Sequence, residues 1–198
     1  MNVSIDDIKK LKELTGVGLT DAKNALIEVE GNFDKALESM RKKGLTKAEK
    51  KGDREAREGL IDSYVHSGRR GVVVEVNSET DFVARLDGFK QVAHEIALQV
   101  AAMSPIYINE SDIPVSELAR VRSEYEEKIA ADNKPADIAS KIVDGQVKKY
   151  FADKVLYSQT YIKDEKQTVA DYIKENIAKL GENIVVRQFK RIELGVNE

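Results

Sequence analysis

Three carboxylates, those of Glu75, Glu79 and Asp81, lie close together in the sequence and could act as general acid and base or hold a divalent cation. Such a site also needs a basic or nucleophilic partner in register, and the neighbouring residues supply none. The alternation of the strand that carries Glu75 leaves the faces of Glu75 and Glu79 undecided. We therefore expect a protein that is not an enzyme, and we keep a metal-dependent hydrolase using Glu79 and Asp81 as an alternative.

The two histidines give little support for catalysis. His94 lies within a periodic apolar helix, where a surface or boundary position is expected. His66 stands at the end of a strand, beside Gly68 and Arg69. Its position is equally compatible with a partner contact and with an ordinary polar loop residue.

The sequence Gly16-Val17-Gly18 has the start of a dinucleotide-binding loop but not the rest of it. Asp21 stands where the GxGxxG pattern requires glycine, and a helix precedes the loop where a strand is needed. We interpret these glycines as a tight turn with an exposed backbone, which suits close contact with another protein. No GxxxxGK[ST] loop is present, so the chain is not itself a P-loop nucleotide hydrolase.

Phe82 follows the acids and lies just beyond the stretch from Gly71 to Asn77. The β-branched valines of this stretch predict a largely buried strand. The residues between the strand and Phe82 are turn formers and acids. A large aromatic side chain in this position either fills the core or points at something outside. The stretch alone does not decide between these two roles.

Helix signals organise the N-terminal part of the chain. Ser4 is expected to cap a first helix that stops at Gly16, and Thr20 a second that ends at Gly31. Asn32 is expected to cap a third helix, which Gly44 ends. We predict a three-helix bundle over residues 1–44, followed by a charged, solvated linker over residues 45–57.

The remaining residues, 58–198, predict an α+β core. Two strands, 60–66 and 71–77, read as an antiparallel hairpin, and a strand over 183–194 would complete a small sheet of about three strands. Helices are predicted over 89–103 and 168–180, with an extended segment at 159–162. Two more helices, 116–131 and 135–154, are expected to pack as an antiparallel hairpin.

Composition limits the partners and the compartment. The chain has 198 residues, a formal charge of −3 and no cysteine, which argues against bulk attraction to nucleic acid or anionic membranes and excludes disulfides and thiolate metal sites. No apolar run is long enough for a membrane helix, and the first residues do not form a signal peptide. We expect a cytoplasmic protein that binds neither nucleic acid nor membrane.

Several segments resemble the translation elongation factor Ts family. LKELTGVGLTDAKNAL and EGNFDKALESMRKKG resemble its N-terminal module, a three-helix unit similar to ubiquitin-associated domains. YVHSGRRGVVVEVNSETDFVAR resembles the core signature of the family, and TDFVAR is its most specific part. KPADIASKIVDGQVKKYFADKVLYSQTYIKD matches a later part in order and spacing, so the resemblance covers nearly the whole chain.

The resemblance implies a guanine nucleotide exchange factor that promotes GDP release from elongation factor Tu during bacterial protein biosynthesis, without a cofactor or metal. It implies that an Asp-Phe pair enters between helices of the partner's nucleotide-binding domain and disturbs its Mg²⁺ site. The residues concerned, called the wedge below, are Thr80, Asp81, Phe82 and Val83.

The resemblance implies two further contacts with the same partner. One is a docking turn on another helix of its nucleotide-binding domain, formed by Leu14, Thr15, Gly16, Val17, Gly18, Leu19 and Lys23. The other is His66, in a His-x-Gly-Arg context, which would touch a different domain.

The longest family members carry two related core subdomains, whereas this chain has one YVHSGRRGVVVEV unit. Its similarity to short members implies a homodimer, built largely from the region after about Ile106, and a two-plus-two complex. The alternative is a non-catalytic module whose N-terminal helices recruit some other protein while the core only dimerises.

Overall fold

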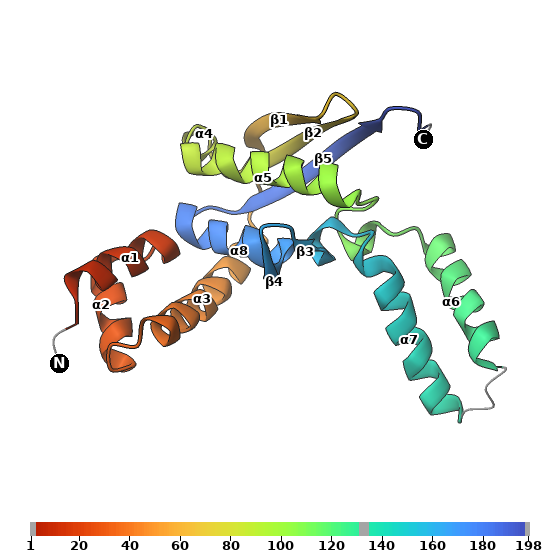
Figure 1. The fold of residues 1–198 in the computed structure, drawn as a ribbon, viewed down its shortest axis with the longest axis horizontal. Helices are drawn as coiled ribbons and strands as arrows, with labels where there is room; N and C mark the ends of the chain where they lie inside the picture. The colour runs from red at the N-terminus through yellow and green to blue at the C-terminus, as the bar shows by residue number, and fades with distance from the viewer. Residues whose placement is uncertain (1–2, 131–134, 197–198) are drawn as a thin grey trace. The chain divides into compact units, whose positions relative to one another are not determined.

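The structure, a computed structural model, describes residues 3–130 and 135–196 and divides into two compact units. The first unit comprises Met1–Leu98 and Ala170–Glu198, and the second comprises Gln99–Val169. Each contains helices and antiparallel strands (Figure 1). The α+β class predicted from the sequence is confirmed.

The first unit opens with three helices, α1 (Ile5–Thr15), α2 (Leu19–Glu28) and α3 (Phe33–Glu49). The caps predicted for α1 and α3 are present: Ser4 Oγ accepts a hydrogen bond from an amide in α1, and Asn32 Oδ1 accepts one from an amide in α3 at 3.0 Å. The helices bury one small apolar cluster, made of Leu11, Ala22, Ala25, Leu26, Ala36 and Met40. The three predicted N-terminal helices therefore form and share a core.

Two predicted helix boundaries are wrong. α2 begins at Leu19 after Gly18, whose carbonyl accepts from the Ala22 amide, so Thr20 lies inside the helix and does not cap it. α3 does not end at Gly44 but runs on to Glu49. A glycine inside a helix costs only about 1 kcal/mol, and burial of Ala48 in the added turn offsets that cost. The division into residues 1–44, 45–57 and 58–198 stays a prediction.

An antiparallel sheet in the order β1-β2-β5 forms the centre of the first unit. Its strands are β1 (Glu58–His66), β2 (Arg70–Ser78) and β5 (Ile184–Glu193). Val72, Val74 and Val76 of β2 are buried on one face. Helix α5 (Asp87–Met103) covers this face in its first part, where His94 Nδ1 lies 3.0 Å from Asp62 Oδ2 of β1 (Figure 1). The predicted hairpin and third strand are thus confirmed.

The opposite face of the sheet carries exposed apolar side chains among polar ones such as Glu75, Gln188 and Lys190. Its apolar side chains are between 48% and 75% exposed and come from all three strands: Ile61, Val65, Val73 and Ile192. Exposed apolar groups gathered on one sheet face mark a surface suited to another protein.

The second unit is built around a helical pair, α6 (Val115–Ala130) and α7 (Ala136–Ala152). Their shared core comprises Val121, Ile129, Val143, Val147, Phe151 and the following Val155. The predicted helical pair is present, while the turn between the helices lies largely in residues 131–134, outside the described residues. Short elements complete this unit: η1 (Glu110–Asp112), η2 (Leu156–Ser158), β3 (Thr160–Tyr161) and β4 (Asp164–Thr168).

The predicted extended segment at 159–162 corresponds to β3, which pairs with β4. The sequence analysis missed β4, because its residues DEKQT are polar and show no apolar alternation. Helix α8 (Val169–Leu180) follows and leads into β5.

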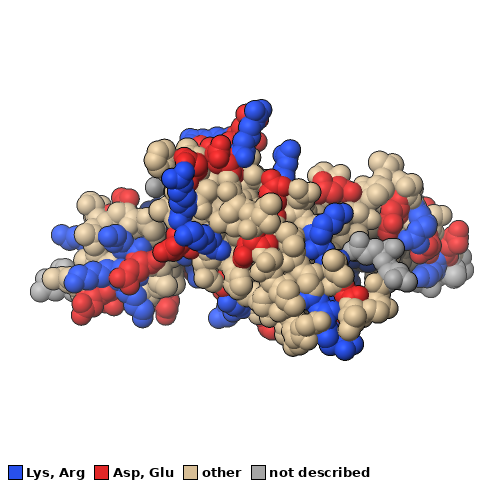
Figure 2. Space-filling model, turned by 90° about the horizontal axis from the view of Figure 1, so that it is seen from above, with Lys and Arg blue, Asp and Glu red and all other residues tan. Residues whose placement is uncertain are grey.

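Acidic and basic side chains are interspersed on the face drawn in Figure 2, so that face has no large area of one sign. Among the described residues, no helix is both long and apolar enough to cross a membrane.

A candidate partner-binding site

The wedge begins where β2 ends. Thr80 is the N-cap of the four-residue helix α4 (Asp81–Ala84), and its Oγ1 accepts a hydrogen bond from the Val83 amide at 3.5 Å. Val83 and Ala84 are buried, whereas the side chain of Phe82 is 77% exposed. A single turn of helix can bury only one side. In α4 the buried side carries Val83 and Ala84, so the ring of Phe82 lies in solvent. The question left open by the sequence is answered: Phe82 points outward.

Asp81 lies beside Phe82 and is paired at the surface. Arg85, four residues later, donates from its guanidinium to Asp81 Oδ2 at 2.6 Å, and both side chains are substantially exposed. An exposed ion pair of this kind contributes about 0–1 kcal/mol. The Asp81 carboxylate can therefore exchange Arg85 for a group on a partner at little cost.

The three acids that could have formed a catalytic or metal site are directed to different partners. Glu75 Oε2 accepts a hydrogen bond from the side chain of Gln188 on β5. Glu79 Oε1 accepts one from the backbone amide of Asn183 at 2.7 Å. Asp81 is bound to Arg85. Within residues 3–130 and 135–196, no group of three or more His, Cys, Asp or Glu side chains could hold a metal ion.

Two residues just before β5, Glu182 and Asn183, bind the start of the wedge and residues 52–54. Glu182, between α8 and β5, accepts two hydrogen bonds from Thr80: the amide donates to Oε2 at 2.9 Å and Oγ1 donates to Oε1 at 2.7 Å. Asn183 Nδ2 donates to the carbonyls of Gly52 and Arg54, which places part of the predicted solvated linker against the core. The sequence analysis missed Glu182 and Asn183, because no local motif marks a contact more than a hundred residues away.

The docking turn joins α1 to α2. Gly16 has φ 68°, the left-handed conformation that glycine adopts readily, and its amide donates to the Lys12 carbonyl at 2.8 Å to end α1. Thr15 is buried and donates from Oγ1 to the Leu11 carbonyl, and Val17 packs against the core of the three helices. The exposed members of the turn are Leu14, Gly16, Gly18, Leu19 and Lys23. The turn therefore presents two leucines and backbone to solvent.

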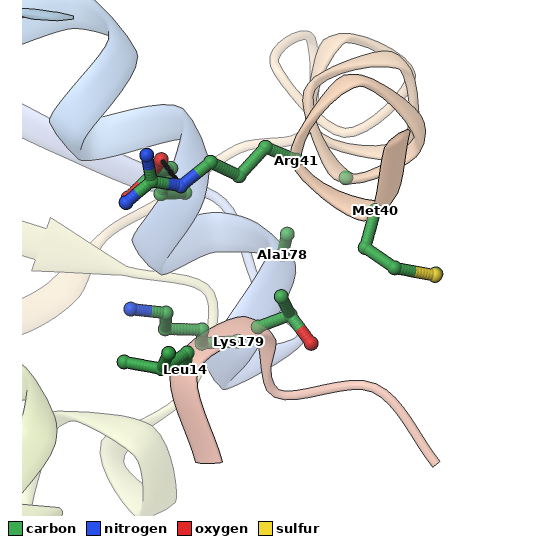
Figure 3. Close-up of a pocket in the computed structure, with 8 residues that line it drawn as sticks. Leu14, Met40, Arg41, Ala178 and Lys179 are labelled. Carbon is green, nitrogen blue, oxygen red and sulfur yellow. Dashed lines mark ion pairs between the residues drawn. The ribbon is translucent and has the colours of Figure 1, made fainter. Parts of the chain in front are cut away.

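The same end of α1 lies beside α8 in the first unit. Arg41 of α3 extends to α8 and pairs with Glu175 at 3.1 Å (Figure 3). Leu14, Met40, Ala178 and Lys179 line the gap between these helices, which leaves about 10 Å³ free. That volume admits at most about one water molecule. The gap is a packed contact and not a ligand site.

His66 ends β1 and is exposed. Tyr64 Oη lies 2.9 Å from its Nδ1, and the Tyr64 ring also meets the edge of His94. In the β1–β2 register His66 faces Arg70, at the opposite end of β2 from the wedge. A strand rises about 3.3 Å per residue, so roughly 26 Å separates the two ends.

The same end of the sheet carries a charged cluster. Arg191 and Arg70 both donate to Glu193, and these hydrogen bonds hold the pKa of the Glu193 carboxyl below its usual value. The cluster ties the last residues of β5 to the start of β2.

Comparison with known proteins gives one consistent result. Residues 6–196 match the family described as Elongation factor TS. A protein named Elongation factor Ts from Herpetosiphon aurantiacus is 46% identical over 198 residues, which cover 100% of both chains. Proteins of the same name from Thermotoga petrophila and Thermoanaerobacter sp. are 50% and 46% identical, over 98% of this chain and 98% and 95% of theirs.

Proposed function

Because the chain belongs to the elongation factor Ts family, we propose that it is a guanine nucleotide exchange factor for elongation factor Tu. It accelerates GDP release by binding the nucleotide-free partner more tightly than the loaded one, without covalent chemistry. The two binding equilibria are linked. The factor by which the chain weakens binding of GDP to elongation factor Tu equals the factor by which GDP weakens binding of the chain.

The wedge is the part of the chain that disturbs the nucleotide site. The observation that carries this proposal is the 77% exposure of Phe82 next to two buried residues, Val83 and Ala84. An aromatic ring held in solvent on an anchored turn gains about 1.5–3 kcal/mol when a partner pocket buries it. Phe82 and Asp81 enter near the Mg²⁺ site of elongation factor Tu, and loss of Mg²⁺ contacts removes charge neutralisation from the bound diphosphate.

The docking turn and His66 hold the partner at other places. Leu14 and Leu19 offer exposed apolar area for a helix of the nucleotide-binding domain, and the glycine backbone allows close approach. His66, about 26 Å away from the wedge along the strand, reaches a different domain of the partner. These contacts supply affinity, whereas the wedge supplies the change at the nucleotide site.

The factor works as a homodimer in a two-plus-two complex in the bacterial cytoplasm. The similarity to short family members implies a dimer contact largely after about Ile106. In that region β5 contributes Ile192 to the exposed sheet face, whose other apolar side chains, Ile61, Val65 and Val73, come from β1 and β2 before Ile106. We place the contact on this face, since burying these side chains between two copies removes four exposed apolar groups per chain from water.

Release of a fluorescent GDP from elongation factor Tu tests the function. We expect the release rate to rise with the concentration of the chain and to saturate. The alternative is a module that only binds and dimerises; it would be retained on some other protein and would leave the GDP release rate unchanged. An unchanged release rate at saturating chain would reject the exchange function.

A further inference from the structure

We propose that Glu182 is a positioning residue for nucleotide exchange, holding the wedge in the orientation that presents Phe82. The inference rests on the proposed function of the wedge. Glu182 is in neither the wedge nor the docking turn, and its side chain acts through Thr80.

The wedge helix cannot hold its own shape. α4 has four residues, and its backbone hydrogen bonds include those from the Ala84 amide to Thr80 and from the Arg85 amide to Asp81, at 3.3 and 3.2 Å. Helices this short are unstable alone, because nucleation fixes several residues for few hydrogen bonds. Their orientation must come from contacts with the rest of the fold.

Glu182 supplies such a contact at the first residue of the wedge. One carboxylate oxygen accepts from the Thr80 amide and the other from the Thr80 hydroxyl, which fixes both the backbone and the side chain of the N-cap. The hydroxyl has one proton and two lone pairs, so it can donate to Glu182 and still accept from the Val83 amide. Hydrogen bonds to a carboxylate are about twice as strong as those between neutral groups.

The support of Glu182 is itself rigid. The next residue, Asn183, is only 2% exposed, and its amide donates to the carboxylate of Glu79, the neighbour of Thr80. Beyond it, Ile184 pairs with Ser78 at the end of the sheet. Glu182 and Asn183, the two residues before β5, thus hold Thr80 and Glu79, the two residues before α4.

The test is a double-mutant cycle on GDP release at saturating chain. We expect Glu182→Ala to lower the maximal release rate by about tenfold, as expected for loss of hydrogen bonds to a charged group. Glu182→Gln keeps one amide oxygen as acceptor and should lose less. The concentration of chain that gives half-maximal rate should change little, because the docking turn and His66 are untouched. Glu127→Ala, an exposed glutamate on α6, is the matched control.

In the Phe82→Ala background, Glu182→Ala should have a much smaller effect, because the ring that it positions is absent and only Asp81 remains to be held. An equal loss in both backgrounds, or no loss in either, would overturn the inference. Thermal unfolding shows whether each variant folds. If Glu182→Ala does not fold, the same cycle with Glu182→Gln tests the inference. If Phe82→Ala alone leaves release unchanged, the proposed wedge function fails, which is a different result from failure of Glu182 alone.

Discussion

Gly16 of the docking turn lies against Lys179 of α8 so closely that a Cβ added at position 16 would stand 2.7 Å from the Lys179 Cα. Real Cβ atoms do not approach a backbone atom to this distance. Glycine is therefore required at position 16 for two reasons, the left-handed φ of 68° and the lack of space. Together with the Arg41–Glu175 pair, this contact joins the N-terminal helices to α8.

A first prediction separates these two reasons. Gly31 also has a left-handed φ, of 83°, but a Cβ there would meet nothing within 4 Å. Gly31→Ala should cost about 1 kcal/mol through its backbone alone, and Gly16→Ala should cost about 1–3 kcal/mol more because α8 must move. Urea unfolding of both variants measures the difference. Equal losses would show that Gly16 does not contact α8 in solution.

A second prediction concerns Asn183, which is 2% exposed and donates to the Gly52 and Arg54 carbonyls. Asn183→Ala leaves these acceptors unpaired and should lower the free energy of unfolding by about 1–3 kcal/mol. Asn24→Ala, at an exposed position in α2, is the control and should change it little. Urea unfolding checks both. A loss no larger than that of the control would mean that residues 52–54 are not held against the core.

These residues show what local sequence can and cannot predict. The Asn32 cap and the valines of β2 were predictable, because caps and strands follow from side chains within a few positions. The predicted end of α3 at Gly44 was wrong, because a glycine predicts a helix end only from local sequence. The helix continues through Gly44, which lies next to Ala178 of α8. The contact of Thr80 with Glu182 joins residues 102 positions apart, and no spacing rule reveals it. The exposure of Phe82 depended on which neighbours were buried, so only the fold could decide it.

A third prediction tests His66. His66→Ala should weaken binding to elongation factor Tu by about three- to tenfold, the range of a single contact near the edge of an interface. The maximal GDP release rate should be kept, because His66 stands at the far end of β2 from the wedge. Tyr64→Phe removes the hydroxyl that lies 2.9 Å from the imidazole and should give a smaller loss of affinity. Titration of the release rate with chain concentration separates the two effects, and a fall in maximal rate at unchanged affinity would contradict this assignment.

A fourth prediction tests the dimer. Ile192→Asp places a charge on the exposed sheet face and should convert a dimer to a monomer in sedimentation equilibrium, since burying an unpaired charge is costly. Val115→Asp is the matched control: Val115 also follows Ile106 and is 83% exposed, but it lies on α6. A monomer with Val115→Asp and a dimer with Ile192→Asp would move the contact to the helical hairpin. A wild-type monomer would reject the dimer.

A fifth prediction concerns the wedge, and Phe82→Ala tests it. The variant removes the exposed ring while keeping the Thr80 cap and the buried Val83 and Ala84. Loss of a buried Phe from a partner pocket corresponds to a fall of about ten- to a hundredfold in the maximal release rate. Val115→Ala removes apolar area from another highly exposed side chain and should leave the rate unchanged.

The most direct measurement is the rate of fluorescent GDP release from elongation factor Tu at saturating chain, with wild type, Phe82→Ala and Val115→Ala side by side. We predict fast release with wild type and Val115→Ala, and release slower by about ten- to a hundredfold with Phe82→Ala. Equally fast release with Phe82→Ala would contradict it.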